Sequence, residues 1–433
     1  MKNFKDSGIE WLGEIPQHWE VVKIKFLAIF YTGDSIKDSE KHKYCFLNNS
    51  IPYISTKDID INTNVIDYNN GMFIEKNDAN FKRAYTNSIL LCLEGANAGK
   101  KIAFLDKEVC FVNKLCCISS KTKKLNSKFL FYFLQSVFFK NVFIANIKGL
   151  IGGITTDQLG NFYMLFPPLK EQEQIANFLD EKCKKIANFI EKKEKLITLL
   201  KEQKQALINE TITKGLDKNI NFKDSGIEWL GEIPQHWRIV KLKYVAFTNI
   251  GLVYTPDDII ENPDEGYPVL RANNIQNGKI DYQDLIYIKS KQIGKKQIIS
   301  SGDLLMCVRN GSENLLGKTA KIQDGYFSFG AFTAIIKSQF NDYFYWIFQT
   351  NMLRKSIASF SASNGIGQIS QDDIKNFIIS FPPLKEQEQI AQFLDSEISK
   401  IDKIIEKTKK QIKLIKEYKI TLTNQAVCGR INL

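Results

Sequence analysis

One segment of the chain comes close to a phosphate-binding loop. Residues Gly311 to Thr319 read GSENLLGKT, whereas the motif Gly-x4-Gly-Lys-Ser/Thr uses its shorter spacing to place backbone N–H groups around the phosphates. Five residues separate Gly311 from Gly317, and the first half of the chain has no equivalent segment. We therefore predict that this segment does not bind ATP.

Two Pro-Pro pairs invite comparison with the loop that holds a flipped adenine in N6-adenine methyltransferases. That loop needs Asn or Asp before the prolines, because its polar side chain binds the amino group of the base. Phe166 and Phe381 occupy this position here. An apolar ring cannot make the hydrogen bond, so neither pair predicts methyl transfer.

Histidine and cysteine show no catalytic or metal-binding arrangement. The three histidines, His18, His42 and His236, are scattered, and packing or capping explains them best. The eight cysteines form no Cys-x-x-Cys pair and lie mostly in apolar runs such as LLCLEG, which predicts buried free thiols. The sequence thus predicts no metal, no cofactor and no enzymatic activity, although a diffuse nuclease site stays open as an alternative.

Side chains that could read bases occur at matched places in the two halves. In the major groove, Arg or Lys suits guanine, Asn or Gln suits adenine, and Asp or Glu suits cytosine. The segment PYISTKDI from Pro52 is aligned with PVLRANNI from Pro268. This alignment sets Ser55, Lys57 and Asp58 against Arg271, Asn273 and Asn274.

A second matched pair of segments ends in polar loops. The segment LLCLE, ending at Glu94, is aligned with LMCVR, ending at Arg309. The same position therefore holds a carboxylate in one half and a guanidinium in the other, so the two halves should favour unlike bases. The remaining candidates follow these ends: Asn97 and Asn310 for bases, and Lys100, Lys101, Lys318 and Lys321 for phosphates. For any one position, a loop side chain that only faces water is an equally good interpretation.

A third matched segment precedes each Pro-Pro pair. Gly152 to Asp157 (GGITTD) is aligned with Gly367 to Asp372 (GQISQD). Its hydroxyl and amide side chains could contact DNA, but Thr or Ser followed by acidic residues is the usual start of a helix, and capping is the favoured interpretation.

These candidates belong to a chain that carries one module twice. Phe4 to Trp19 (FKDSGIEWLGEIPQHW) recurs unchanged as Phe222 to Trp237, and Phe166 to Asp180 (FPPLKEQEQIANFLD) recurs as Phe381 to Asp395 with one substitution. Between the repeated blocks lie two stretches, 20–165 and 238–380, that match only in scattered positions. Fixed frames around divergent contents predict two recognition modules with different targets.

A long helix should follow each Pro-Pro pair, because proline can begin a helix but not continue one. Apolar residues recur there at gaps of three, four and seven, which predicts a heptad seam in each helix and packing of the two helices on each other. The seams are Ile175, Leu179, Ile186, Ile190, Ile197, Leu200 and Leu207, and Ile390, Leu394, Ile401, Ile405, Ile412, Ile415 and Leu422. A helix from 171 to 214 would be at most roughly 66 Å long, a spacer suited to sites within about two turns of B-form DNA.

Composition narrows the class of protein. With 433 residues, 44% hydrophobic and 25% charged, the chain is that of a globular protein of more than one domain. Short alternating or β-branched segments broken by Asn, Gly and Asp predict mixed α/β domains rich in sheet. A net charge of +11 favours a polyanionic partner. The sequence shows no apolar run of 18 residues, so we expect a cytoplasmic protein without a membrane partner.

The repeated GIEWLGEIPQHW block, the repeated FPPLKEQEQIA block that opens a heptad helix, and their placement around variable stretches resemble the DNA-specificity subunit of Type I restriction-modification systems. The resemblance covers nearly the whole chain. It implies an α+β fold with two pseudo-repeated target recognition domains separated by two long helices in an antiparallel coiled coil. The implied domains are 1–167 and 217–382, and the implied spacer helices are 168–216 and 383–433.

The resemblance also implies partners. A specificity subunit of this family binds double-stranded DNA at a split, asymmetric site, docks two copies of an adenine methyltransferase subunit, and is joined by motor-nuclease subunits for cleavage. Trp11, Trp19, Trp229 and Trp237 are identical in the two frames and are candidates for docking, or else they pack the join between domain and helix. The alternative function is a coiled-coil scaffold whose variable domains bind proteins rather than DNA.

Overall fold

The computed structural model describes residues 3–9, 12–45, 49–149, 152–228, 230–310, 315–351, 356 and 368–433. The chain divides into two compact units, Met1–Glu194 with Lys409–Leu433, and Lys195–Thr408. Each unit contains one copy of both repeated blocks and opposite ends of the two long helices. The predicted α+β class, with two repeated domains and two long helices, is confirmed.

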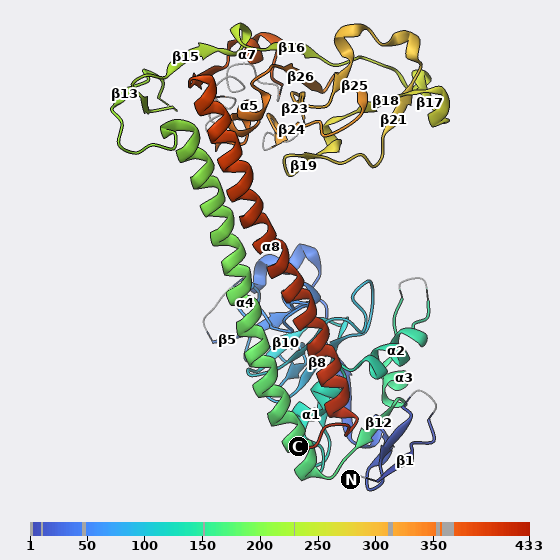
Figure 1. Ribbon diagram of the computed structural model, residues 1–433. Coiled ribbons are helices and arrows are strands. Elements are labelled where there is room, and N and C mark those ends of the chain that lie inside the picture. The colour runs from blue at the N-terminus through green and yellow to red at the C-terminus, as the bar shows by residue number, and fades with distance from the viewer. Residues whose placement is uncertain are drawn as a thin grey trace. The chain divides into compact units, whose positions relative to one another are not determined.

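The two long helices are α4 (Leu169–Lys214) and α8 (Leu384–Val427). In the first unit the start of α4, at Ile175 and Leu179, shares a core with the end of α8, at Leu422 and Ala426. In the second unit the order is reversed, because the end of α4 shares a core with the start of α8, at Ile390. The helices therefore pack antiparallel, as predicted (Figure 1).

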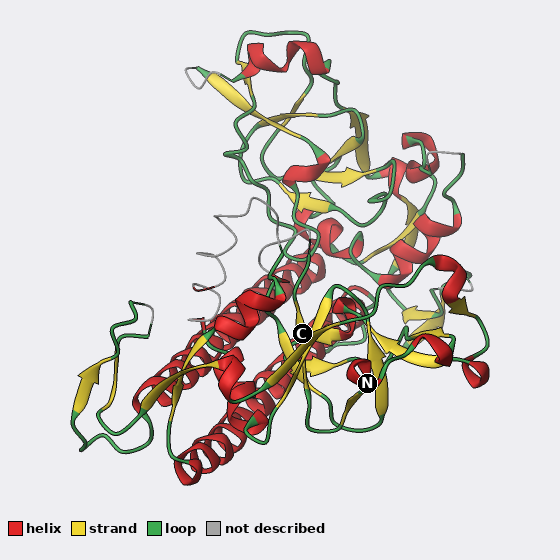
Figure 2. Ribbon diagram, turned by 90° about the horizontal axis from the view of Figure 1, so that it is seen from above, coloured by secondary structure: helices red, strands yellow, loops and turns green. Residues whose placement is uncertain are grey.

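Outside the two long helices, the described chain consists mainly of short strands, short helices and loops (Figure 2). In the first unit, a hairpin pairs β1 (Phe4–Asp6) with β2 (Glu14–Pro16). One four-stranded sheet has the order β6 (Phe73–Glu75), β5 (Ser50–Ile54), β10 (Val109–Phe111), β7 (Arg83–Ala84). The other has the order β4 (Ala28–Thr32), β11 (Leu115–Ser120), β8 (Ile89–Cys92), β9 (Ile102–Phe104). The pair β12 (Tyr163–Phe166) and β3 (Glu20–Lys23) leads into α4. The described part of the unit also contains the helices α1 (Ser127–Phe133), α2 (Val137–Ala145) and α3 (Thr156–Gly160).

The second unit repeats this plan. Its hairpin is β13 (Phe222–Asp224) with β14 (Glu232–Pro234), and β15 (Arg238–Lys241) pairs with β27 (Ile378–Phe381) before α8. One sheet contains β16 (Phe247–Ile250), β26 (Thr333–Lys337), β23 (Leu304–Cys307) and β24 (Thr319–Lys321). The other contains β17 (Ile259–Ile260), β21 (Ile286–Ile288), β18 (Tyr267–Leu270), β25 (Tyr326–Phe329) and β22 (Ile299–Ser300), beside the hairpin of β19 (Ile275–Gln276) and β20 (Lys279–Ile280). The helices α5 (Asn341–Phe348) and α7 (Gln371–Asn376) complete the unit.

Matching strands carry the matched sequence segments. The strands β8 and β23 are buried throughout and lie second from the edge of equivalent sheets. Each unit also contains a parallel strand pair, β5 with β10 and β18 with β25. In these pairs Phe111 lies opposite Ile54, and Phe329 lies opposite Leu270. The register gives a residue-by-residue correspondence between the two domains.

The repeated blocks bind each other. In the first unit the Trp19 side chain is 0% exposed and its Nε1–H donates to Glu171 Oε2 at 3.1 Å. In the second unit Trp237 is equally buried and donates to Glu386 at 2.8 Å. The prediction that Trp19 and Trp237 dock a partner is corrected, because buried rings tie each frame to its helix. Trp11 and Trp229 lie outside the described residues.

A glutamine in each helix start fixes the Pro-Pro turn. Gln172 is buried and donates from Nε2 to the carbonyl oxygens of Pro167 at 2.8 Å and Lys124 at 3.0 Å. Gln387 makes the equivalent bond to Pro382 at 2.8 Å. A buried amide needs such partners, so internal structure explains why these residues are identical in both halves.

The cysteines and the apolar helices agree with a packed core. All eight cysteines are free thiols, and burial raises the pKa of Cys110 to about 11 and that of Cys428 to about 12. No single helix in the described ranges has the length and apolarity needed to cross a membrane; α1 and α2 reach that criterion only as a pair, with a bend of 64° between them. Within the same ranges no three His, Cys, Asp or Glu side chains are grouped as metal ligands.

Candidate nucleic-acid interface

Two of the predicted base-reading side chains are used inside the fold. The carboxylate of Asp58, 8% exposed, accepts hydrogen bonds from the Ser55 N–H at 2.8 Å and Oγ–H at 2.6 Å. Asn274, 1% exposed, accepts from the Arg271 N–H at 2.9 Å and donates to two carbonyl oxygens across the turn. Both predictions are corrected, because exposing either side chain to a base would break a buried turn.

Two predicted phosphate contacts are also internal ties. Lys101 donates from Nζ to the carbonyl oxygen of Thr56 at 2.6 Å, and Lys318 donates to that of Ile275 at 3.0 Å. Both are half-buried and occupy equivalent positions, since their carbonyls accept from Cys92 and Cys307 respectively. Each lysine anchors the turn that follows β5 or β18, and neither is a free phosphate ligand.

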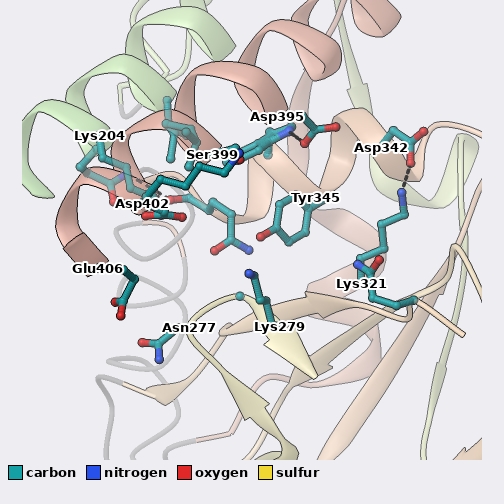
Figure 3. A pocket seen from close by; sticks show the side chains of 18 of the residues that line it. Lys204, Asn277, Lys279, Lys321, Asp342, Tyr345, Asp395, Ser399, Asp402 and Glu406 are labelled. Atoms are coloured by element: carbon teal, nitrogen blue, oxygen red, sulfur yellow. Dashed lines mark hydrogen bonds and ion pairs between the residues drawn. The ribbon is translucent and has the colours of Figure 1, made fainter. Parts of the chain in front are cut away.

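Lys321 forms an ion pair with an acidic residue of a neighbouring helix. It pairs with Asp342 of α5 in a polar cavity of ≈ 800 Å³ that Lys204 of α4 and Asp395 of α8 also line (Figure 3). The Trp346 indole donates to Asp395 at 3.0 Å in the same cavity. Asp342 thus pairs with Lys321 in the free chain, and the phosphate contact of Lys321 stays a prediction.

The remaining candidates are exposed or half-buried at the loops. In the first domain these are Lys57, Glu94, Asn97 and Lys100, and in the second they are Arg271, Asn273, Arg309 and Asn310. Ser55 is half-buried, and its hydroxyl donates to the cap described above. The backbone is held in the same way at Glu94 and at Arg309, because Glu94 forms a β-bridge with Gly153 and Arg309 forms one with Gln368.

The matched segment before each Pro-Pro pair caps a short helix, as favoured above. The Thr155 hydroxyl accepts from the Gln158 N–H at 3.2 Å at the start of α3, and the Ser370 hydroxyl accepts from the Asp373 N–H at 3.1 Å at the start of α7. The residues just before these caps bind the backbone that follows β8 and β23, since the N–H groups of Ile154 and Ile369 donate to the carbonyl oxygens of Leu93 and Val308. The segment therefore holds the loops in place.

Sequence reasoning missed a third position in each domain. The correspondence of Phe111 with Phe329 sets Lys114 against Phe332 three residues later. Their carbonyl oxygens accept equivalent bonds from the N–H groups of Leu93 at 3.0 Å and Val308 at 2.9 Å. Lys114 and Phe332 are exposed beside Glu94 and Arg309. The signal was present in the sequence, because a Phe precedes both positions by three residues.

Electrostatics differ between the two sets of loops. In the second domain the Arg309 guanidinium lies over the Phe332 ring, 5.2 Å from its centroid. Burial raises the pKa of Tyr254 there, although the nearby positive charge of Arg271 lowers that pKa in part. In the first domain Glu94 and Lys114 occupy the corresponding positions. Equivalent scaffolds thus present unlike chemistry, which is the arrangement expected of two readers with different targets.

Comparison with known proteins identifies the family. The model of the Type I restriction modification DNA specificity domain matches twice, at residues 16–199 and 234–414, and the chain belongs to this family. The two matches coincide with the two repeats. Specificity subunits recognise DNA and do not catalyse, so the chain is not an enzyme but the DNA-recognition component of a restriction-modification complex.

Individual relatives agree. The chain is 27% identical over 451 residues to the Type I restriction enzyme MjaVIII specificity subunit of Methanocaldococcus jannaschii, covering 100% of this chain and 96% of that protein. It is 29% identical over 206 residues to the EcoKI specificity subunit of Escherichia coli K12, covering 46% of this chain and 44% of that one.

Two solved structures share the fold. One comes from a study of complex assembly and conformational transition in a type I restriction-modification system, with TM-score 0.76, 17% identity, and coverage of 96% of this chain and 99% of that one. The other is the HsdS subunit of Thermoanaerobacter tengcongensis, with TM-score 0.57, 17% identity, and coverage of 96% and 98%.

Proposed function

We propose that the chain reads a bipartite, asymmetric DNA sequence, one half with each repeated domain. The proposed recognition domains are residues 1–167 and 217–382, and the proposed spacers are 168–216 and 383–433. The observation that carries the proposal is that equivalent loops hold unlike side chains, Glu94 and Lys114 in one domain and Arg309 and Phe332 in the other. A net charge of +11 supports an anionic ligand.

The repeated frames are the proposed docking surfaces for two copies of an adenine methyltransferase subunit, which motor-nuclease subunits join for cleavage. Trp19 and Trp237 are buried, but Glu14, Gln17 and His18 of the first frame are exposed and recur as the exposed Glu232, Gln235 and His236 of the second. Identical exposed side chains on two frames suit two copies of one partner. The complex is expected in the cytoplasm, where its DNA is.

The test is co-expression of the chain with the adjacent methyltransferase gene, followed by mapping of methylated adenines in host DNA by single-molecule sequencing. A split asymmetric motif that is modified only when this chain is present supports the proposal. An intact, soluble complex that methylates no motif, or one continuous motif, contradicts it and favours the coiled-coil scaffold, for which no salt-dependent DNA binding is expected.

Removing one exposed cation from the first reading loop should weaken DNA binding without changing the sequence preference. Lys100 is exposed on the loop after β8, and a phosphate contact there would release counterions on binding. A plot of log affinity against log salt concentration has a negative slope. For Lys100→Gln we expect this slope to become less steep by about 1. Titration of labelled DNA at several salt concentrations measures the slope, and Lys195→Gln, on an exposed face of α4, is the control that should leave it unchanged.

A further inference from the structure

A pocket opens where three loops of the second domain meet. Its walls are Leu252–Tyr254 after β16, Arg271–Asn273 after β18, and Gly330–Phe332 after β25, and its volume is ≈ 480 Å³. These loops include the matched positions that distinguish this domain from the first. The pocket is therefore built from the variable part of the domain, not from its frame.

The pocket holds a cation that lacks an acidic partner within the described residues. The Arg271 guanidinium donates from Nη2 to the carbonyl oxygen of Asp284 at 2.8 Å, which orients the group. Its Nε is buried, and the described part of the chain supplies it with no hydrogen-bond acceptor. A buried donor without a partner costs free energy, and within the described residues the charge of Arg271 stays available to a ligand with acceptor atoms.

The rim of the pocket is apolar and exposed. Val253 is 81% exposed and Phe332 is 54% exposed, whereas Tyr254 is half-buried against Arg271. Phe332 also carries Arg309 on its ring face. Exposed apolar side chains grouped around a cation are typical of a binding surface, and the combination fits a base edge that offers acceptors beside a methyl group.

The chemistry of two bases matches these features. Guanine presents O6 and N7 as adjacent acceptors in the major groove, which a guanidinium binds in a bidentate manner. Thymine presents its 5-methyl group, which packs against apolar or aromatic side chains. No other base offers either feature in the same form.

We propose that Arg271 contacts a guanine in the half-site of the second domain, and that Val253 and Phe332 contact the methyl group of an adjacent thymine. This inference rests on the proposed function. The first domain has Ser55 at the position of Arg271 and Lys114 at the position of Phe332. It lacks the guanidinium and the aromatic rim, so its half-site is read by other means.

The first test uses the unaltered complex and altered DNA. Once methylation mapping has given the motif, the guanine of the second half-site is replaced by 7-deazaguanine, which lacks the N7 acceptor, and the thymine by uracil, which lacks only the methyl group. We expect the first change to weaken binding roughly 5- to 20-fold and the second roughly 2- to 10-fold. The same changes at bases outside the motif are the control.

The second test uses altered protein. The complex with Arg271→Gln should lose roughly 5- to 150-fold of its preference for guanine at one position and gain tolerance of adenine there. The variant Phe332→Lys introduces the residue of the first domain at an exposed position and should relax the thymine alone. The first half of the motif should stay unchanged in both variants.

Each outcome separates the two proposals. If the unaltered complex methylates no split motif, the proposed function fails. If it methylates a split motif whose second half has no guanine, or if the deaza and uracil substitutions leave binding unchanged, the pocket assignment fails while the proposed function stands. Should Arg271→Gln prevent assembly, Phe332→Lys and the modified bases decide the question.

Discussion

Replacing Trp237 with alanine should lower the free energy of unfolding of the second unit by about 3–5 kcal/mol. The ring is fully buried and joins the frame block to the start of α8 through its bond to Glu386. It also packs on the end of α4, because a Cβ placed on Gly215 would lie 3.1 Å from the ring. Urea denaturation measures the free energy of unfolding, and hydrogen exchange of the α8 amides shows whether the loss lies in the second unit.

The variant Trp237→Phe separates the two contributions. Phenylalanine keeps most of the buried ring but removes the N–H donor, so we expect a smaller loss of about 1–3 kcal/mol. The mirror variant Trp19→Ala should loosen the first unit and leave the amides at the start of α8 protected. Unchanged stability of Trp237→Ala, together with failure to bind a partner subunit, would contradict the structural role and restore the docking hypothesis.

Replacing Gly251 with alanine should disrupt the second recognition domain. A Cβ at this position would lie 2.2 Å from the carbonyl oxygen of Gly330 and 2.4 Å from that of Phe329. These atoms belong to the backbone of a neighbouring loop, so no side-chain movement can relieve the contact. We expect a loss of at least about 3 kcal/mol, at the upper end for an overpacked core. Thermal unfolding and the loss of specificity for the second half-site measure it.

Gly330→Ala is the matched control. A Cβ there would meet nothing closer than 3.4 Å, which is ordinary van der Waals contact with Tyr254. We expect the melting temperature to stay nearly unchanged. In the first domain, Gly33 is as tightly enclosed as Gly251, with a Cβ only 1.8 Å from the carbonyl oxygen of Phe111. Equal melting temperatures for Gly251→Ala and Gly330→Ala would contradict this account of the loop.

Much of the architecture could be predicted from the sequence, because local patterns mark both long helices and each pattern occurs twice. The Pro-Pro pairs mark both helix starts, and the seams predict which faces pack, as the buried Leu179 and Leu394 show. At the end of α4, Leu207 packs against the core as predicted, but the more deeply buried residue is its neighbour Ile208. A strict heptad drifts about 20° per repeat against a straight helix, which moves the buried stripe to the neighbouring residue.

The candidate base-contacting residues were harder to predict, because their availability depends on hydrogen bonds inside the fold. Internal alignment found positions with unlike side chains, including Arg271 and Arg309, but it could not distinguish a free side chain from one used in a turn. Ser-x-x-Asp from Ser55 to Asp58 is a capping-box pattern and could have been recognised. The bonds of Lys101 and Lys318 to distant carbonyl oxygens depend on tertiary packing, which no local pattern reveals.

The central claim is that each repeated domain reads its own half of the DNA site. The most direct measurement replaces residues 20–165 with the corresponding stretch of another specificity subunit of known motif, and maps methylated adenines in cells that express the hybrid with its methyltransferase. We expect one half of the motif to change to that of the donor, while the other half and the split arrangement stay the same. A hybrid that assembles and methylates the original motif in full, or that changes both halves together, would contradict the claim.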